Sequence, residues 1–267
     1  MPTAEEARLD ADRFRGFADI YDDVRPRLPV YAAKVIARYL GHAPGTVVDL
    51  GCGTGLSTLV WKGRCDTVIG VEPSEDMLAQ ARSRESAGVG FRQGYSHDTG
   101  LPDGCADAVV CSQSFHWMEP ESTLREAGRL LKPGGVFAAV DYDWPPLCGW
   151  EAELAYQELR RQLKRAEEEL PALRATFRRW EKEGHLANIR GSGRFRFVRE
   201  VVFLSRETGS AERYRQLAMS EGGVQSLLKL DPDRILPCLQ RIEQAAEKLP
   251  AGEFPLDFCY RMRIGIK

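Results

Sequence analysis

The segment 47–57, with the sequence Val-Val-Asp-Leu-Gly-Cys-Gly-Thr-Gly-Leu-Ser, constrains the fold of this chain more than any other. An apolar strand reaches the acidic Asp49, glycines follow at 51, 53 and 55, and a helix is expected from Ser57. Glycine at this density is typical of backbone that turns sharply and lies against a ligand. A second apolar strand, 68–71, ends at another acid, Glu72. Two acids at the ends of parallel strands predict a nucleotide-like cofactor site at that edge of the sheet.

The glycine spacing separates two classes of cofactor. A nicotinamide dinucleotide loop has the pattern Gly-x-Gly-x-x-Gly/Ala, whereas Leu56 stands here at the third of those positions. Asp49 would also repel a pyrophosphate, because like charges repel. S-adenosylmethionine is the better match, since it carries a sulfonium and an ammonium. We expect Asp49 to orient the ammonium, and Gly51, Gly53 and Gly55 to let the backbone approach the methionine and the ribose. Glu72 is expected to accept hydrogen bonds from the ribose hydroxyls.

The order of the predicted elements specifies the fold class. Strands are expected at 47–50, 68–71, 89–93, 108–112 and 136–142, and helices at 30–40, 57–62, 74–84 and 120–131. This strict alternation predicts an α/β fold with a doubly wound parallel sheet. Segments 194–205 and 258–266 alternate apolar with polar residues and predict a sixth and a seventh strand.

We expect three parts along the chain. Residues 1–145 would form an N-terminal segment and the cofactor-binding core, 146–193 a helical insertion, and 194–267 the rest of the core sheet with added helices. Apolar residues recur at helical spacing within 150–186 and predict two helices. We interpret them as a lid over the carboxyl edge of the sheet, although such stripes are also typical of helices that only pack.

Composition limits the partners. The formal net charge is −2 and the hydrophobic content is 43%, so no overall field would draw the chain to nucleic acid or to an anionic membrane. No apolar run approaches the roughly 18 residues that span a bilayer, and no secretory signal begins the sequence. Seven cysteines without a Cys-x-x-Cys pair predict reduced thiols in a cytoplasmic protein. The histidines show no metal-ligand spacing, so no metal is expected.

Four stretches together resemble the class I S-adenosylmethionine-dependent methyltransferases over residues 15–145: Asp49–Gly55, Glu72, Asp107–Trp117 and Leu130–Phe137. The resemblance implies a Rossmann-like seven-stranded sheet whose last strand is antiparallel and lies between the fifth and the sixth. Tyr21–Pro26 with Phe115–Trp117 is similar to a small-molecule branch that includes trans-aconitate methyltransferase-like proteins.

The implied activity is in-line transfer of a methyl group to a small-molecule acceptor, at oxygen or else at nitrogen, sulfur or carbon, with S-adenosylhomocysteine as product. Two alternatives stay open. One is a catalytically silent module that binds S-adenosylmethionine. The other is a nicotinamide oxidoreductase, against which Leu56 argues.

His116 is the candidate catalytic residue, because it follows the fourth strand and an unperturbed histidine pKa near 6.5 suits a base. The alternative is that His116 only shapes the pocket. Four aromatic residues near it are expected to contact the substrate: Phe115, Trp117, Tyr142 and Trp144.

Further residues are predicted to contact the cofactor. Tyr21 would cover the methionine end of the cofactor. Arg25 would bind a carboxylate of the cofactor or of the substrate through two parallel hydrogen bonds. Ser112 and Gln113, at the end of the fourth strand, would meet the methionine moiety. The adenine is expected to pack against Met77, although a core role suits this residue as well. The adenine is also expected to contact either Asp98 or the backbone of Ser96.

Overall fold

The computed structural model describes residues 24–174 and 179–267. A seven-stranded sheet in the order β3-β2-β1-β4-β5-β7-β6 forms its centre. The strands are β1 (Thr46–Leu50), β2 (Thr67–Glu72), β3 (Val89–Gln93), β4 (Ala106–Ser112), β5 (Leu131–Tyr142), β6 (Phe197–Gly209) and β7 (Phe254–Ile266). β1 to β5 pair in parallel, and β7 runs antiparallel between β5 and β6. The predicted doubly wound sheet with an antiparallel last strand is therefore confirmed.

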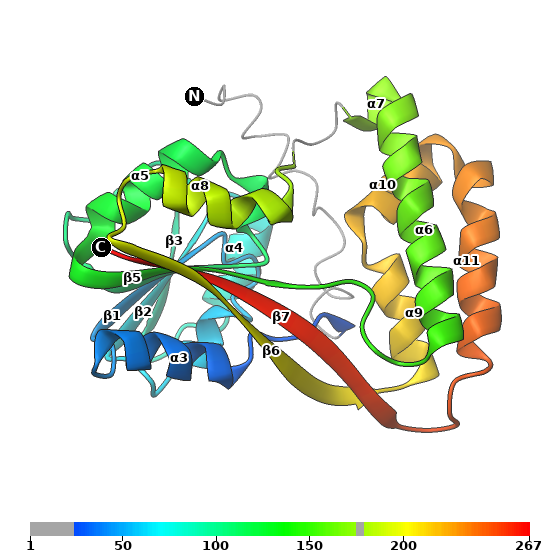
Figure 1. The fold of residues 1–267 in the computed structure, drawn as a ribbon, viewed down its shortest axis with the longest axis horizontal. Helices are drawn as coiled ribbons and strands as arrows, with labels where there is room; N and C mark the ends of the chain where they lie inside the picture. Colours follow the sequence, from blue (N-terminus) through cyan, green and yellow to red (C-terminus); the bar gives the residue numbers. More distant parts are fainter. Residues whose placement is uncertain (1–23, 175–178) are drawn as a thin grey trace.

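Helices cover both faces of this sheet (Figure 1). One face carries α3 (Val30–Leu40), the 3₁₀ turn η1 (Thr58–Trp61) and α4 (Glu75–Arg82), whose apolar residues share a core with the sheet. The other face carries η2 (Phe115–Trp117), α5 (Pro120–Leu130) and α8 (His185–Gly191), around a second core. A sheet buried on both faces explains why its strands read as nearly continuous apolar runs.

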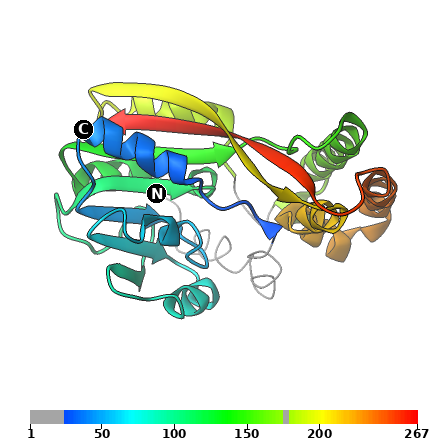
Figure 2. The same cartoon turned by 90° about the horizontal axis from the view of Figure 1, so that it is seen from below.

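A group of helices stands beyond the carboxyl ends of the parallel strands, and we call it the helical unit (Figures 1 and 2). Its members are α6 (Trp150–Glu169), α7 (Pro171–Arg174), α9 (Ala211–Met219), α10 (Gly222–Leu230) and α11 (Pro232–Ala246). The unit therefore draws on two insertions, one after β5 and one between β6 and β7. In the described part of the chain no helix is long and apolar enough to cross a membrane.

The sequence predicted most of the helices and strands, but the structure differs from the prediction in the type or the presence of some of them. Pro29 and Gly41 mark the ends of α3, and its predicted range 30–40 is confirmed. The helix predicted at 57–62 is wrong in kind, because only a short 3₁₀ turn forms there and the hydroxyls of Ser57 and Thr58 bond to Asp49. Helix α10 was not predicted, and α8 packs against α5 and the sheet rather than within the helical unit.

The glycine loop after β1 is held against β2. The amide groups of Gly51 and Cys52 donate to the carbonyl of Val71. Gly55 has a φ of +88°, and a Cβ there would lie 2.7 Å from the Phe91 ring. Both the left-handed backbone and the close ring therefore require glycine at this position.

Replacing Gly55 with alanine should destabilise the fold by about 1–3 kcal/mol beyond the backbone strain, because the new methyl group overpacks against Phe91. Gly63→Ala is the matched control, since its φ is +72° but nothing lies within 4 Å of the new atom. Urea unfolding of both variants measures the difference. Equal losses of stability would contradict the packing argument.

Candidate active site

Asp49 lies at the carboxyl end of β1 and is fully buried. Its Oδ2 atom accepts hydrogen bonds of 2.7 Å from both Ser57 Oγ and Thr58 Oγ1. Its Oδ1 atom is buried and has no hydrogen-bond partner among the described residues. A buried carboxylate oxygen without a donor is costly, so this oxygen is suited to a ligand that brings a donor.

Glu72 lies at the end of β2 and is 8% exposed. Its two oxygens accept 3.0 Å hydrogen bonds from the backbone N–H groups of Gly53 and Ser74. These bonds fix the carboxylate and leave lone pairs for further donors. Burial raises the pKa of Asp49 to about 6 and that of Glu72 to about 7.

The three glycines of the loop differ in their surroundings. A Cβ on Gly51 would meet Met118 and Ser114 within 2.8 Å, and one on Gly55 would meet Phe91, so both glycines are required by packing. A Cβ on Gly53 would meet no atom of the described residues within 4 Å. The space beside Gly53 is thus open next to the Glu72 carboxylate. Together with the unpartnered oxygen of Asp49, it fits a cofactor with an ammonium and a ribose diol.

The remaining residues predicted to bind the cofactor differ in their burial and in their hydrogen bonds. Met77 on α4 is buried (4% exposed). Tyr95 and Asp98 pair through their backbones in a tight turn, which leaves the Asp98 side chain exposed. Ser96 Oγ lies 3.0 Å from Thr123 Oγ1, and Ser112 ends β4. Tyr21 lies outside the described residues, and the contacts of all these residues with a cofactor stay predictions.

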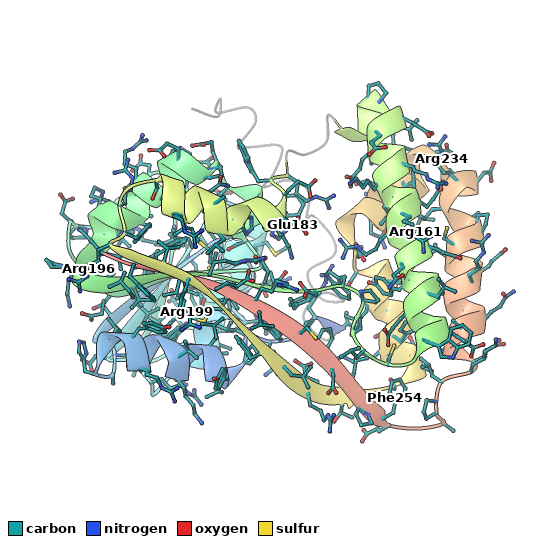
Figure 3. The ribbon with its side chains drawn as sticks, viewed as in Figure 1. Arg161, Glu183, Arg196, Arg199, Arg234 and Phe254 are labelled. Atoms are coloured by element: carbon teal, nitrogen blue, oxygen red, sulfur yellow. The ribbon has the colours of Figure 1, made fainter. Side chains whose placement is uncertain are left out.

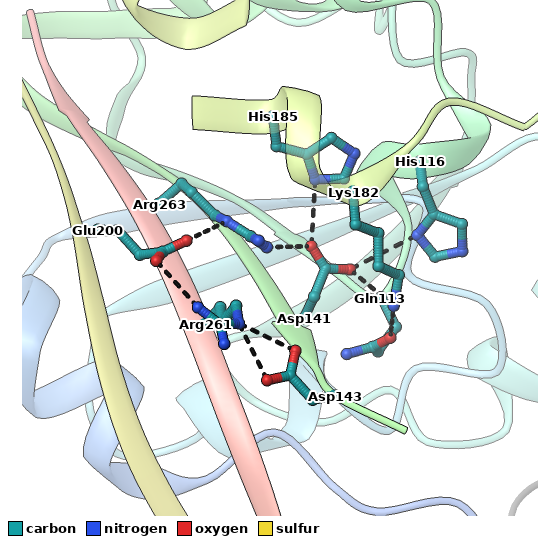
Figure 4. Close-up of polar contacts among 9 residues, drawn as sticks. All are labelled: Gln113, His116, Asp141, Asp143, Lys182, His185, Glu200, Arg261 and Arg263. Atoms are coloured by element: carbon teal, nitrogen blue, oxygen red, sulfur yellow. Dashed lines mark hydrogen bonds and ion pairs between the residues drawn. The ribbon is translucent and has the colours of Figure 1, made fainter. Parts of the chain in front are cut away.

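Asp141 on β5 is the centre of a buried polar cluster that includes His116 (Figure 4). Its Oδ2 accepts hydrogen bonds from Arg263 Nη1 at 3.0 Å and His185 Nδ1 at 3.2 Å. Its Oδ1 lies 3.3 Å from Lys182 Nζ and 3.5 Å from His116 Nδ1. The carboxylate thus ties η2, α8 and the segment before α8 to the sheet.

The charges in this cluster set its protonation states. Burial alone would raise the pKa of Asp141, but the charge of Lys182 and the neighbouring His116 and His185 outweigh it and hold that pKa well below its usual range. Burial, with the charge of Lys182, lowers the pKa of His116 to about 3. The imidazole is therefore neutral at pH 7, and it is a weaker base than the ordinary histidine pKa of 6.5 implied.

A cavity of about 460 Å³ opens between His116 and the helical unit. Its walls include Gln113, His116 and Trp117 from the sheet side, Trp144 after β5, and the polar face of α6. Figure 3 marks its opposite walls with Arg161 on α6 and Glu183 before α8. Its volume is in the range of small-ligand pockets.

Five of the residues predicted to act in catalysis or to bind the cofactor or the substrate line this cavity. Arg25, Gln113, His116, Trp117 and Trp144 line it. Gln113 therefore stands beside His116 and Lys182, where Lys182 Nζ donates to its Oε1 at 2.9 Å.

The substrate contact expected of Phe115 stays a prediction. This ring is 1% exposed, packs against Phe137 and His185, and is not among the described residues that line the cavity. Tyr142 is also buried; its hydroxyl accepts a 3.1 Å hydrogen bond from Arg25. Tyr142 thus supports a wall residue rather than forming the wall.

Sequence reasoning missed Lys182, His185 and Arg263 as partners of Asp141, and Arg160 as a wall residue of the cavity. Each lies more than 15 residues from Asp141 in a segment without a recognisable motif. The only signal in the sequence is the run of cations on one face of the 150–169 helix.

Comparisons with known proteins assign part of the chain to a family. Residues 48–139, which span β1 to β5 and hold Asp49, Glu72 and His116, match the family model of a methyltransferase domain. The chain contains a class I S-adenosylmethionine-dependent methyltransferase domain. The predicted family is thus confirmed, whereas the narrower trans-aconitate branch stays a prediction.

Relatives of the methyltransferase domain are moderately similar. An uncharacterized methyltransferase of Mycobacterium tuberculosis is 33% identical over 126 residues, which cover 47% of this chain and 51% of the relative. A malonyl-(acyl-carrier protein) O-methyltransferase of Pectobacterium atrosepticum is 29% identical over 129 residues, which cover 48% of this chain and 51% of the relative. The chain thus spans about half the length of the curated relatives it matches.

One solved structure extends the similarity in fold to nearly the whole chain. A candidate type II methyltransferase from Anaeromyxobacter dehalogenans superposes with a TM-score of 0.65 at 21% identity, covering 91% of this chain and 97% of that one. At this identity the match concerns the fold alone. The methyltransferase domain and the helical unit therefore belong to an architecture already seen in a solved structure.

Cofactor affinity should rise with pH between 5.5 and 7.5. Glu72, with a pKa of about 7, and Asp49, with a pKa of about 6, are mostly protonated at pH 5.5 and mostly ionised at pH 7.5. Because the ammonium and the ribose hydroxyls bind the ionised forms, affinity for S-adenosylhomocysteine should fall about tenfold or more at the lower pH. Calorimetry across this range measures it, with Glu72→Gln expected to flatten the slope. A constant affinity in the native protein would contradict this assignment.

Asp141→Asn should destabilise the fold by about 3 kcal/mol or more, because Arg263 and Lys182 would remain largely buried without their shared carboxylate. Asp143→Asn is the matched control, since the Asp143–Arg261 pair is partly exposed and such pairs contribute less than about 1 kcal/mol. Denaturant unfolding of both variants compares the two losses. Similar losses would show that Asp141 is not the centre of the cluster.

Proposed function

We propose that this protein transfers a methyl group from S-adenosylmethionine to a small-molecule acceptor bound in the cavity beside His116. The observation that carries the proposal is the buried Oδ1 of Asp49, which has no hydrogen-bond partner among the described residues and lies near the space at Gly53 and the fixed carboxylate of Glu72. An ammonium supplies a donor for the Oδ1 of Asp49, and a ribose diol supplies donors for the remaining lone pairs of Glu72.

The residues of the chain have separate tasks in this proposal. When bound, S-adenosylmethionine supplies an electrophilic methyl group, whose carbon bonds to the acceptor as its bond to sulfur breaks and the sulfur keeps the electron pair. Asp49 and Glu72 hold one reactant, and the cavity walls hold the other. Fixing two reactants in line can contribute about 7–11 kcal/mol, so positioning is the main catalytic task of the protein.

His116 is the proposed contact to the acceptor. Its Nδ1 faces Asp141, which favours a proton on that nitrogen and leaves Nε2 as an acceptor. With a pKa of about 3, the imidazole orients a donor group on the acceptor better than it removes a proton. An acceptor that is already anionic needs no base at all.

The nature of the acceptor atom is a further part of the proposal. We favour oxygen over nitrogen, sulfur and carbon, because the Pectobacterium relative is named an O-methyltransferase. The size of the cavity supports a small molecule, and the net charge of −2 argues against nucleic acid. Seven free cysteines support a reducing, cytoplasmic location.

The two alternatives of the sequence analysis remain as outcomes of a test. A silent module would bind S-adenosylhomocysteine without turnover on any acceptor, and an oxidoreductase would bind NADH instead. The position of Leu56 after the loop still argues against the second.

Glu72→Gln should weaken binding of S-adenosylhomocysteine by about 1.5–3 kcal/mol, the range for hydrogen bonds to charged groups. His116→Ala should instead leave that affinity within about twofold and lower turnover, since His116 is proposed to contact the acceptor and not the cofactor. Calorimetry and release of S-adenosylhomocysteine across an acceptor panel measure the two effects. Unchanged binding in Glu72→Gln would place the ribose elsewhere, and equal losses of binding and turnover in His116→Ala would make it a packing residue.

A further inference from the structure

Cationic side chains gather in the walls of the cavity. Six of the residues that line it are Arg25, Arg160, Arg161, Lys164, Arg179 and Lys182. The carboxylates that line it are fewer, namely Glu167, Glu181, Glu183 and Glu221. Glu167 pairs with Arg179 at 2.9 Å, Glu181 and Glu183 are exposed, and Glu221 is half-buried. The interior of the cavity is therefore electropositive, although the whole chain has a net charge of −2.

Helix α6 turns one polar face toward the cavity. Gln157, Arg160, Arg161 and Lys164 follow the i, i+3, i+4, i+7 spacing of one helix face, and all four line the cavity. Arg160 is half-buried, and in the described part of the chain it forms no ion pair. A partly desolvated guanidinium without a carboxylate favours an external anion.

Arg160 meets two further cations that come from distant segments. Arg25 is held by the hydroxyl of Tyr142 at 3.1 Å and the carbonyl of Ser220 at 2.7 Å. Lys182 is held by Gln113 and Asp141. Burial lowers the pKa of Lys182, and the charges of Arg160 and Arg25 lower it further. These cations thus repel one another, and a bound anion would relieve the repulsion.

Gln113 adds a donor to the same place. It has a φ of +54°, the one left-handed residue other than glycine among the described residues. Its Oε1 is occupied by Lys182, while its Nε2 is buried and has no hydrogen-bond partner in the described chain. A strained backbone that presents an unused donor is typical of a binding site.

We propose that the cavity recognises its acceptor through an anionic group, a carboxylate or a phosphate, held by Arg160 of α6 together with Arg25, Lys182 and Gln113. This inference rests on the proposed function and names the substrate class of the same site. A guanidinium binds two oxygens of such a group side by side. Trp117, Trp144 and Trp180 also line the cavity and provide aromatic surface for an organic body. The acceptor is thus an organic anion, and α6 selects it.

The test uses three probes with the same ring: benzoate, phenyl phosphate and the uncharged benzamide. Binding to the full-length protein is measured by saturation-transfer NMR without cofactor, and binding of S-adenosylhomocysteine is measured on the same preparations. At least one anionic probe should bind tenfold or more tightly than benzamide, and the tighter one identifies the anion. Arg160→Gln should weaken that binding fivefold or more.

Arg165→Gln is the matched control, because Arg165 lies on α6, is exposed and does not line the cavity. Its binding of the probes should equal that of the native protein. If benzamide binds as tightly as both anions, or if Arg160→Gln and Arg165→Gln behave alike, the inference is overturned while binding of S-adenosylhomocysteine keeps the proposed function intact. Loss of S-adenosylhomocysteine binding in the native protein would overturn the proposed function instead, whatever the probes show.

Discussion

The close approach of the glycine loop to β2 is the constraint on which the rest of the site depends. Gly51 and Cys52 donate to Val71, and Gly53 donates to the side chain of Glu72. These bonds form only if the backbone turns through left-handed conformations that glycine adopts at low cost. They bring the ends of β1 and β2 together, so that Asp49 and Glu72 flank the same open space. The resulting burial raises the pKa of both carboxyl groups. Their ionised forms are therefore stabilised by a ligand that donates hydrogen bonds.

A second buried carboxylate organises the acceptor side. Asp141 holds Arg263 of the neighbouring strand, His185 of α8, and Lys182 of the segment before α8. It therefore couples the sheet to the residues that line the cavity opposite α6. Removing two charges from water is unfavourable unless each is well partnered, and Asp141 meets this requirement through four neighbours. The position of His116 follows from the same carboxylate.

The sequence predicted those parts of the molecule that depend on local pattern. Strand alternation and the acids at strand ends identified the sheet, Asp49 and Glu72, because the carboxyl ends of parallel strands meet at one edge. It did not predict α10, which begins with two glycines, nor the burial of Phe115, whose aromatic character suits a core as well as a cavity. Lys182 and Arg160 depend on how α6 and residues 179–185 pack against the sheet, which no local pattern encodes. The low pKa of His116 likewise follows from burial, which is a property of the folded chain.

The central claim is that the space between Asp49, Gly53 and Glu72 holds S-adenosylmethionine. A crystal structure of the native protein grown with S-adenosylhomocysteine tests it most directly. The account predicts the ribose hydroxyls within hydrogen-bond distance of Glu72, the ammonium near Asp49, and the sulfur facing the cavity lined by His116. Ligand density at another place, or none in crystals grown at saturating concentration, would contradict it.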